Sequence, residues 1–242
     1  MKFVLSVLGA ALLLAGCNGP SRETMLKGLE STPVNDILAK PELHRDADAV
    51  GKAVFVDNCA SCHGADLKGL DDKHTPDLTD GKWLYWGDDL ERYRMHPADI
   101  EKTILYGIRS GDPKSRNLAV MPAKGEDANL TPAEIDQTAE YILQLSGRPV
   151  DAAKAKQGQR VFADKGECWD CHLPDGTGDG ALGSANLAQP DTWLYGSDRA
   201  SIVRTLTEGR QGVCPAFHDK LTAGEIKAAA IYVHDAAAGL DF

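Results

Sequence analysis

Apolar residues recur with the period of an α-helix along much of the chain. The clearest stripe consists of Ile135, Ala139, Ile142 and Leu145. Thr131 and Glu134, which directly precede this stripe, form the capping box that starts a helix, and Thr222 and Glu225 repeat the box near the C-terminus. No segment shows a convincing alternation of apolar and polar residues, which would be typical of a strand. The pattern therefore predicts an all-α protein.

Most of the chain consists of two copies of one order of motifs. The copies are recognised by three pairs of segments: Gly51-Lys-Ala-Val-Phe55 and Gly158-Gln-Arg-Val-Phe162, Cys59-Ala-Ser-Cys-His63 and Cys168-Trp-Asp-Cys-His172, and Met121-Pro-Ala and Cys214-Pro-Ala. Two copies fit two small domains better than a solenoid, which needs more units. Gly147 and Pro149 stop a helix between the copies. We therefore expect one domain at 48–147 and a second at 151–242, each a small helical bundle.

The N-terminus has the features of an export signal. Lys2 is followed by an apolar run that is too short to cross a bilayer comfortably. The run ends in Leu14-Ala-Gly-Cys17, which resembles the lipobox of bacterial lipoproteins, where cleavage precedes a cysteine that receives the lipid. We expect a signal peptide at 1–16, lipidation of Cys17 and a polar, lipid-anchored tether at 17–47 with one short helix. An ordinary signal peptide with a chance cysteine is the alternative.

Composition narrows the function further. The chain has 242 residues, of which 43% are apolar and 26% are charged, as in a globular protein. Its net charge is −10 and it has no basic cluster, so nucleic-acid binding is excluded. There are six cysteines, and four of them fall into two pairs with the same spacing. That spacing favours a cofactor over a disulfide framework.

The Cys-x-x-Cys-His motif at 59–63 returns at 168–172. Two thiols at this spacing can add to the two vinyl groups of haem, and the following histidine can reach the iron. The motifs therefore predict two covalently bound haem c groups, with Cys59, Cys62, Cys168 and Cys171 as attachment points and His63 and His172 as proximal ligands. A redox dithiol would need a βαβ pattern that is absent, and a four-cysteine zinc site would leave both histidines unexplained.

With these motifs, both copies resemble class I cytochrome c, and more closely the cytochrome c domains of cbb3-type oxidase subunit III. The similar features are the Gly and Phe before each motif, the Trp-Leu-Tyr at 83–85 and 193–195, and the Met121-Pro-Ala turn. The resemblance implies a helical fold around each haem and one-electron transfer. It also implies that the backbone carbonyl of Pro76, and of Ala185 in the second copy, accepts the proximal histidine N–H. The family's subunit carries a transmembrane helix where this chain has the lipobox-like sequence.

The two copies differ at the expected sixth ligand of the iron. In class I cytochromes this ligand is usually a methionine before a turn, and Met121 has that place in the first copy. Met95 and His96 are the fallback ligands there. The second copy contains no methionine and has Cys214 at the corresponding position. Cys214, His218 or an open iron are the alternatives for the second haem.

Two function classes remain open. The first is a dihaem cytochrome on the periplasmic face of a bacterial membrane, which carries single electrons between respiratory-chain partners such as an oxidase, a reductase or another cytochrome. The protein would supply insulation, orientation and tuning of the potentials. The alternative is a dihaem redox enzyme that resembles thiosulfate dehydrogenase, with a cysteine-ligated catalytic haem. No acid–base pair stands out near either motif, which favours the electron carrier.

Overall fold

The structure is a computed structural model that describes residues 19–85, 96–117 and 119–239. Its long helices begin where the sequence supplies caps, as at the two capping boxes of Thr131 and Thr222. The helices are α1 Arg22–Glu30, α2 Val34–Ile37, α3 Pro41–Asn58, α4 Ala60–His63, α5 Pro97–Tyr106, α6 Lys124–Asp127, α7 Pro132–Leu145, α8 Ala152–Ala163, α9 Trp169–His172, α10 Arg199–Glu208 and α11 Ala223–Ala237, with 3₁₀ turns η1 Asp71–Lys73 and η2 Pro190–Thr192. The described residues form isolated bridges but no strand, which confirms the all-α prediction.

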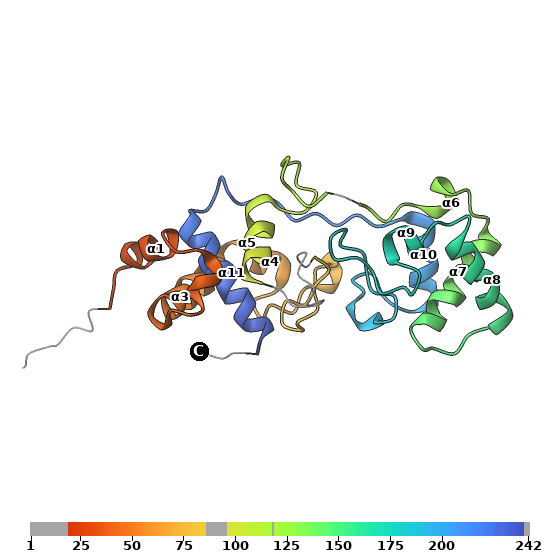
Figure 1. Ribbon diagram of the computed structural model, residues 1–242, viewed down its shortest axis with the longest axis horizontal. Coiled ribbons are helices and arrows are strands. Elements are labelled where there is room, and N and C mark those ends of the chain that lie inside the picture. Colours follow the sequence, from red (N-terminus) through yellow and green to blue (C-terminus); the bar gives the residue numbers. More distant parts are fainter. Residues whose placement is uncertain (1–18, 86–95, 118, 240–242) are drawn as a thin grey trace, which may run out of the picture.

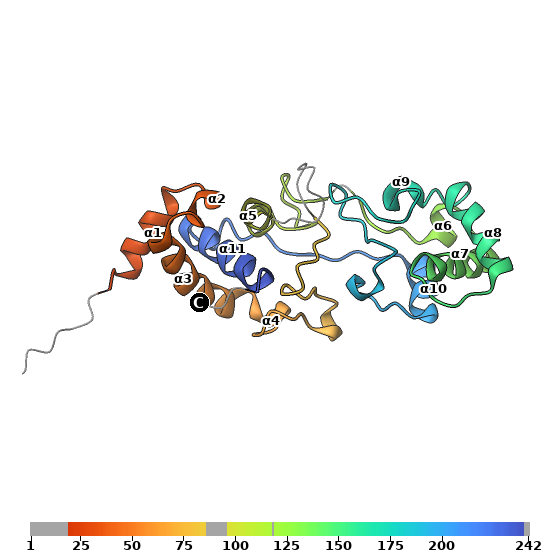
Figure 2. The same cartoon turned by 60° about the horizontal axis from the view of Figure 1, so that its bottom comes forward.

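The helices gather into two lobes that lie end to end (Figure 1). The first lobe consists of α1 to α5 together with α11, the last helix of the chain. The second lobe consists of α6 to α10. The sequence predicted two continuous domains, but the structure exchanges the final helix of each copy: α7 packs on α8, and α11 packs on α3. Figure 2 shows the same exchange from a second direction.

The contact between α3 and α11 forms the core of the first lobe. The two helices approach so closely that a Cβ at Gly51 would collide with the carbonyl oxygen of Ala228. One turn further along α3, Phe55 packs against Tyr232 with 5.7 Å between the ring centroids. Phe55 is 1% exposed. Glycine is required at position 51 because only a hydrogen atom fits between the two backbones.

The second lobe repeats this contact with the partners exchanged. A Cβ at Gly158 of α8 would collide with the carbonyl of Gln137 in α7. Tyr141 and Phe162 meet edge to face at 5.3 Å between centroids. The two copies therefore provide equivalent glycine and aromatic contacts, whether each terminal helix packs within its own copy or on the other copy.

Two segments connect the lobes and pair with each other at both ends. We call them the crossing segments: 108–121, which includes a loop at 109–115 and in which residue 118 is not described, and 210–214. At one end Ile108 and Cys214 each donate an N–H to the carbonyl of the other, at 2.9 and 3.0 Å. At the other end Met121 and Arg210 form the same reciprocal pair, at 3.1 and 2.7 Å. These bonds hold each segment on its path from one lobe to the other.

The segment expected as a tether is largely folded. Its short helix is present as α1, but α1, α2 and the start of α3 also pack on the first lobe. Leu29 and Ile37 are fully buried there. Burial of apolar side chains, worth about 1.5–3 kcal/mol each, explains why this stretch is ordered. Cys17 and the expected signal peptide lie outside the described residues. Within the described part of the chain, no helix is long and apolar enough to span a bilayer.

The helix exchange predicts how a cut chain behaves. A protease site inserted after Gly147, between α7 and α8, would produce two fragments that each contribute helices to both cores. We expect the fragments to stay together through size-exclusion chromatography in native buffer and to separate in strong denaturant, which serves as the control. Two continuous domains would separate after the cut without denaturant.

Candidate haem sites

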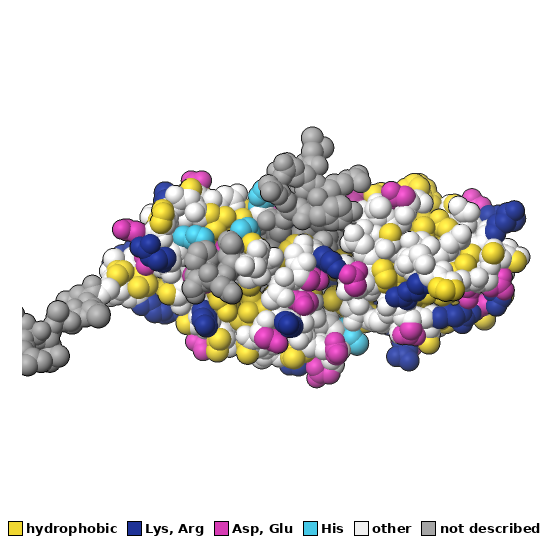
Figure 3. All heavy atoms as spheres, turned by 90° about the horizontal axis from the view of Figure 1, so that it is seen from below, with side chains coloured by type: hydrophobic (Ala, Val, Ile, Leu, Met, Phe, Trp, Pro, Cys, Tyr) yellow, Lys and Arg dark blue, Asp and Glu magenta, His cyan; other side chains and the backbone are white. Residues whose placement is uncertain are grey.

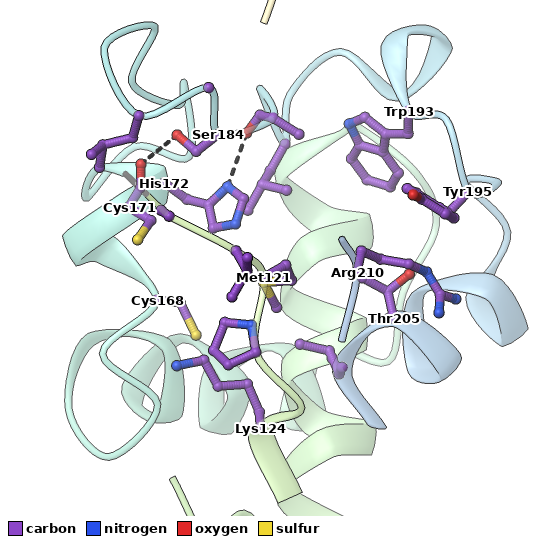
Figure 4. Close-up of a pocket in the computed structure, with 18 of the residues that line it drawn as sticks. Met121, Lys124, Cys168, Cys171, His172, Ser184, Trp193, Tyr195, Thr205 and Arg210 are labelled. Carbon is purple, nitrogen blue, oxygen red and sulfur yellow. Dashed lines mark hydrogen bonds between the residues drawn. The ribbon is translucent and has the colours of Figure 1, made fainter. Parts of the chain in front are cut away.

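The second Cys-x-x-Cys-His motif lies at the end of α8, where the chain turns into the short helix α9. Cys168 caps α9, and Cys171 and His172 lie within it. The Nδ1 atom of His172 is 2.9 Å from the carbonyl oxygen of Ala185 (Figure 4). With Nδ1–H donated to this carbonyl, the Nε2 lone pair is free to bind a metal. The geometry confirms the role expected for Ala185.

A loop on the far side of α9 holds this arrangement in place. The hydroxyl of Ser184 donates to the Cys171 carbonyl at 2.6 Å and accepts from the Asp179 N–H at 2.6 Å. Gly178 has a positive φ of 77°, and a Cβ there would strike the carbonyl of Ser184. Ser184 was not among the residues singled out from the sequence, although it has a counterpart in the first copy.

A cavity of about 450 Å³ opens in front of His172. Its lining includes both motif cysteines and Met121 (Figure 4). The sequence predicted Met121 opposite His63, in its own copy, but the structure places it with His172. The physical reason is the pairing of Met121 with Arg210, which carries the methionine across to the second lobe.

The cavity has the chemistry that a haem requires. Its lining is largely apolar and it brings together two thiols, an oriented imidazole and a thioether sulfur. The buried Nε atom of Arg210 has no hydrogen-bond partner among the described residues. A propionate of haem is an anionic acceptor that would satisfy this donor. The residues present therefore fit a covalently attached haem.

The first motif is arranged in an equivalent way. We call the two groups the first cradle, with Cys59, Cys62 and His63, and the second cradle, with Cys168, Cys171 and His172. His63 ends the short helix α4, and the hydroxyl of Thr75 donates to the Cys62 carbonyl at 2.6 Å, as Ser184 does to Cys171. Both hydroxyls follow their cysteine by 13 positions, which is the repeat signal that could have found them. The Nδ1 atom of His63 is buried without a hydrogen bond to any described residue. Burial lowers the pKa of His63, and the nearby Pro76 carbonyl partly offsets that change.

Cys214 lies in the first lobe, not beside the second motif. Its backbone pairs with Ile108 at the end of α5. Burial, together with the smaller effect of the neighbouring Cys62 thiol, raises the pKa of Cys214 to about 11. Burial also raises the pKa of Cys59 and of Cys168 to about 11. The five described cysteines form no disulfide with one another.

The alternative ligands are engaged elsewhere or undescribed. His218 lies between two carboxylates, 2.9 Å from Asp112 and 2.9 Å from Asp219. His96 lies at the start of α5 in the first lobe. Met95 lies outside the described residues.

Aromatic and arginine side chains join the two lobes near the cavity in front of His172. Tyr85 packs against the backbone of Gly183 and accepts a hydrogen bond from Arg109 at 3.3 Å. Arg109 also donates to the Gly212 carbonyl at 2.5 Å, and it lines the cavity in front of His172. Trp193 donates its indole N–H to the Asn186 carbonyl, so this donor is already used within the second lobe.

Comparisons with known proteins agree with this geometry. The cytochrome c family model matches residues 49–146, and the model of cbb3-type cytochrome c oxidase subunit III matches residues 153–233. The chain is 41% identical to the FixP subunit of the cbb3-type oxidase from Bradyrhizobium sp. over 90% of its length and 71% of the relative's. It is 38% identical to the CcoP subunit from Cereibacter sphaeroides over 89% and 70%. It is also 43% identical to FixP from Azorhizobium caulinodans over 87% and 67% of the two chains.

The fold and the two cradles define a dihaem c-type cytochrome. The chain belongs to the CcoP and FixP family of cbb3-type cytochrome c oxidase subunits. It carries two covalently bound haem c groups, one for each cytochrome c domain of its sequence.

The cradles predict a haem count for each variant. Replacing Cys168 and Cys171 by serine should reduce covalent haem from two per chain to one, because serine cannot form the thioether bonds. The same pair of changes at Cys59 and Cys62 should have the same effect. A pyridine haemochrome assay after acid–acetone extraction measures the count. Cys214→Ser is the matched control and should retain two; a count of two in either double variant would contradict the assignment.

Proposed function

We propose that this protein carries single electrons between partners of a cbb3-type respiratory chain. The observation that carries the proposal is that one chain contains two equivalent cradles. The relatives of this chain are oxidase subunits. Haem is attached at Cys59 and Cys62 in one cradle and at Cys168 and Cys171 in the other. His63 and His172 are the proximal ligands, and the sulfur atoms of Met121 and Cys214 complete the axial sets.

When bound, each haem supplies a reversible one-electron iron couple, and the chain supplies its surroundings. The Ala185 carbonyl holds the proton on Nδ1 of His172 and so fixes the orientation of the ring. Ser184 and Thr75 anchor the backbone of the two motifs. Arg210 presents a buried N–H that fits a propionate. Fixed, buried surroundings keep the reorganisation small when an electron arrives or leaves.

Contacts between the lobes support electron exchange between the two haems. His74 of the first lobe stacks on Tyr195 of the second, with 4.7 Å between the ring centroids, and it hydrogen-bonds to the Leu194 carbonyl. Lys82 forms an ion pair with Asp191 across the same boundary. These contacts keep the distance and orientation between the two cradles constant, and electron transfer between two haems requires this.

The relatives and the N-terminal sequence support the proposed partners and location. The relatives are subunits of cbb3-type oxidases, so an oxidase is the proposed electron acceptor. We place the protein on the periplasmic face of a bacterial membrane, held by lipid on Cys17 after removal of 1–16. Acidic and basic side chains are interspersed over the face shown in Figure 3, which suits transient docking better than a permanent apolar interface.

The electron-carrier function predicts two separate one-electron steps. In a potentiometric titration the purified dihaem protein should take up two electrons per chain, and the reduced form should pass them to a cbb3-type oxidase. Thiosulfate should not be turned over, because the proposed function is electron transfer without substrate chemistry. Sustained thiosulfate oxidation by the purified protein would favour an enzyme instead.

The lipid anchor predicts a change in partitioning. Cys17→Ser should move the protein from the membrane fraction to the soluble periplasmic fraction and leave two haems per chain, because position 17 precedes both cradles. Fractionation with immunoblotting measures the first effect and haem staining the second. Asn18→Ser is the matched control. A Cys17→Ser protein that stayed in the membrane fraction would contradict lipid anchoring at this residue.

A further inference from the structure

The tyrosine of each Trp-Leu-Tyr motif packs against the other copy across the boundary between the lobes. Tyr85 lies against Gly183, where a Cβ would collide with the tyrosine ring. Tyr195 lies against His74, with 4.7 Å between the ring centroids and 33° between the ring planes. His74 and Gly183 occupy the same place in the two copies, since each follows the histidine of its motif by 11 positions (63 to 74, and 172 to 183). The two equivalent contacts therefore differ in the residue that meets the tyrosine.

Histidine is the less favourable residue at this place in the repeat. The backbone of His74 is left-handed, with φ 51° and ψ 43°, where it ends the 3₁₀ turn η1. Gly183 also has a positive φ, of 74°. The left-handed region is strained for a residue with a Cβ and relaxed for glycine. The first copy keeps a histidine where glycine suits the backbone better, which indicates that the imidazole ring itself has a role.

Beyond Tyr195, the contacts lead into the cavity in front of His172. Tyr195 and Arg210 both line that cavity (Figure 4). The guanidinium carbon of Arg210 lies 4.9 Å from the centroid of the Tyr195 ring. The buried Nε of the same arginine is the donor that fits a haem propionate. Tyr195 therefore touches both His74 of the first lobe and the arginine expected at the edge of the second haem.

On the other side, His74 is joined directly to the first cradle. It precedes Thr75, whose hydroxyl donates to the Cys62 carbonyl at 2.6 Å. His74 also donates its Nδ1–H to the Leu194 carbonyl at 3.2 Å, which fixes the imidazole beside Tyr195. A continuous series of bonded and packed atoms therefore runs from the first cradle to the second cavity.

We propose that the contact between His74 and Tyr195 is the bridge through which electrons pass between the two haems. The electron leaves the ferrous iron of one cradle and reaches the ferric iron of the other, so the exchange needs no further oxidant or reductant. Its rate depends on the intervening atoms, because electronic coupling falls more steeply across an empty gap than through bonded or closely packed atoms. Both residues are positioning residues, which fill the space between the cradles. The inference rests on the proposed function, in which both cradles carry haem.

The contact of Tyr85 with Gly183 is the comparison within the same molecule. Glycine offers no ring, so Tyr85 meets the backbone there. At His74 two rings meet, and one of them lines the second cavity. The retained histidine therefore favours the His74–Tyr195 contact as the bridge.

The test compares a variant that removes the imidazole with one that keeps a ring. His74→Gly removes the ring and suits the left-handed backbone, whereas His74→Phe keeps a ring against Tyr195. One-electron photoreduction of the dihaem protein, followed by absorption spectroscopy, measures how fast the electron redistributes between the haems. The rate should fall several-fold in His74→Gly and be retained in His74→Phe. Asp72→Ala, an exposed change on the same turn η1, is the matched control and should keep the rate.

Two further measurements separate a bridge from a spacer that only holds the lobes in position. A potentiometric titration gives the two potentials, and pulsed EPR of the fully oxidised protein gives the distance between the two irons. Both should be the same in His74→Gly as in the unaltered protein, because the helix exchange still ties the lobes together. A slower rate accompanied by a changed iron–iron distance or a changed potential would overturn the proposal.

The remaining outcomes are equally decisive. An unchanged rate in His74→Gly would overturn the bridge, and a slower rate in Tyr85→Leu alone would assign it to the equivalent contact at Gly183. A slow His74→Phe variant would show that the hydrogen bond to Leu194 matters rather than the ring contact, and would also overturn it. If the unaltered protein took up no electrons reversibly, the proposed function itself would fail.

Discussion

The architecture depends on the antiparallel pairing of the two crossing segments. Each carries a reciprocal pair of backbone hydrogen bonds at its ends, Ile108 with Cys214 and Met121 with Arg210. A single such bond contributes only about 1 kcal/mol net, but an unpaired N–H or carbonyl in the partly buried gap between the lobes would cost more. The two segments run in opposite directions. Segment 108–121 leaves the first lobe and brings Met121 and then α7 to the second lobe, whereas segment 210–214 leaves the second lobe and brings Cys214 and then α11 to the first.

The helix exchange is possible because the repeat makes the partners equivalent. Helices α3 and α8 each offer a glycine and, one turn later, a phenylalanine: Gly51 with Phe55, and Gly158 with Phe162. The helix that packs on each of them, α11 or α7, contributes a backbone carbonyl next to the glycine and a tyrosine next to the phenylalanine. The short connection from Ser146 to Asp151 favours the exchange, since it leaves α7 beside α8. Glu140 strengthens this hairpin by accepting from the Asp151 N–H and from Arg199, both at 2.9 Å.

The two cradles share their backbone geometry and differ in the side chains around them. Lys124, Arg109 and Arg210 line the cavity in front of His172, but so do Asp127, Glu167 and Asp170. Lys124 is only 8% exposed and forms an ion pair with Asp127 at 2.9 Å. The additional group near the first motif is the thiol of Cys214. The two cradles therefore offer a haem different surroundings.

The sequence by itself determined the helical class, the two-copy organisation and both Cys-x-x-Cys-His motifs, because these depend on periodicity and on spacings within one turn. The resemblance to class I cytochrome c also indicated the backbone acceptor at Ala185, because this residue aligns with Pro76. Only the tertiary structure decided that Met121 lies with His172, that Cys214 lies with the first motif, and that residues 22–47 pack on α11. The two copies are equivalent, so α7 and α11 find the same local contacts on α3 as on α8. The crossing segments and the short connection between α7 and α8 decide which pairs form. These are long-range features that local sequence patterns do not encode.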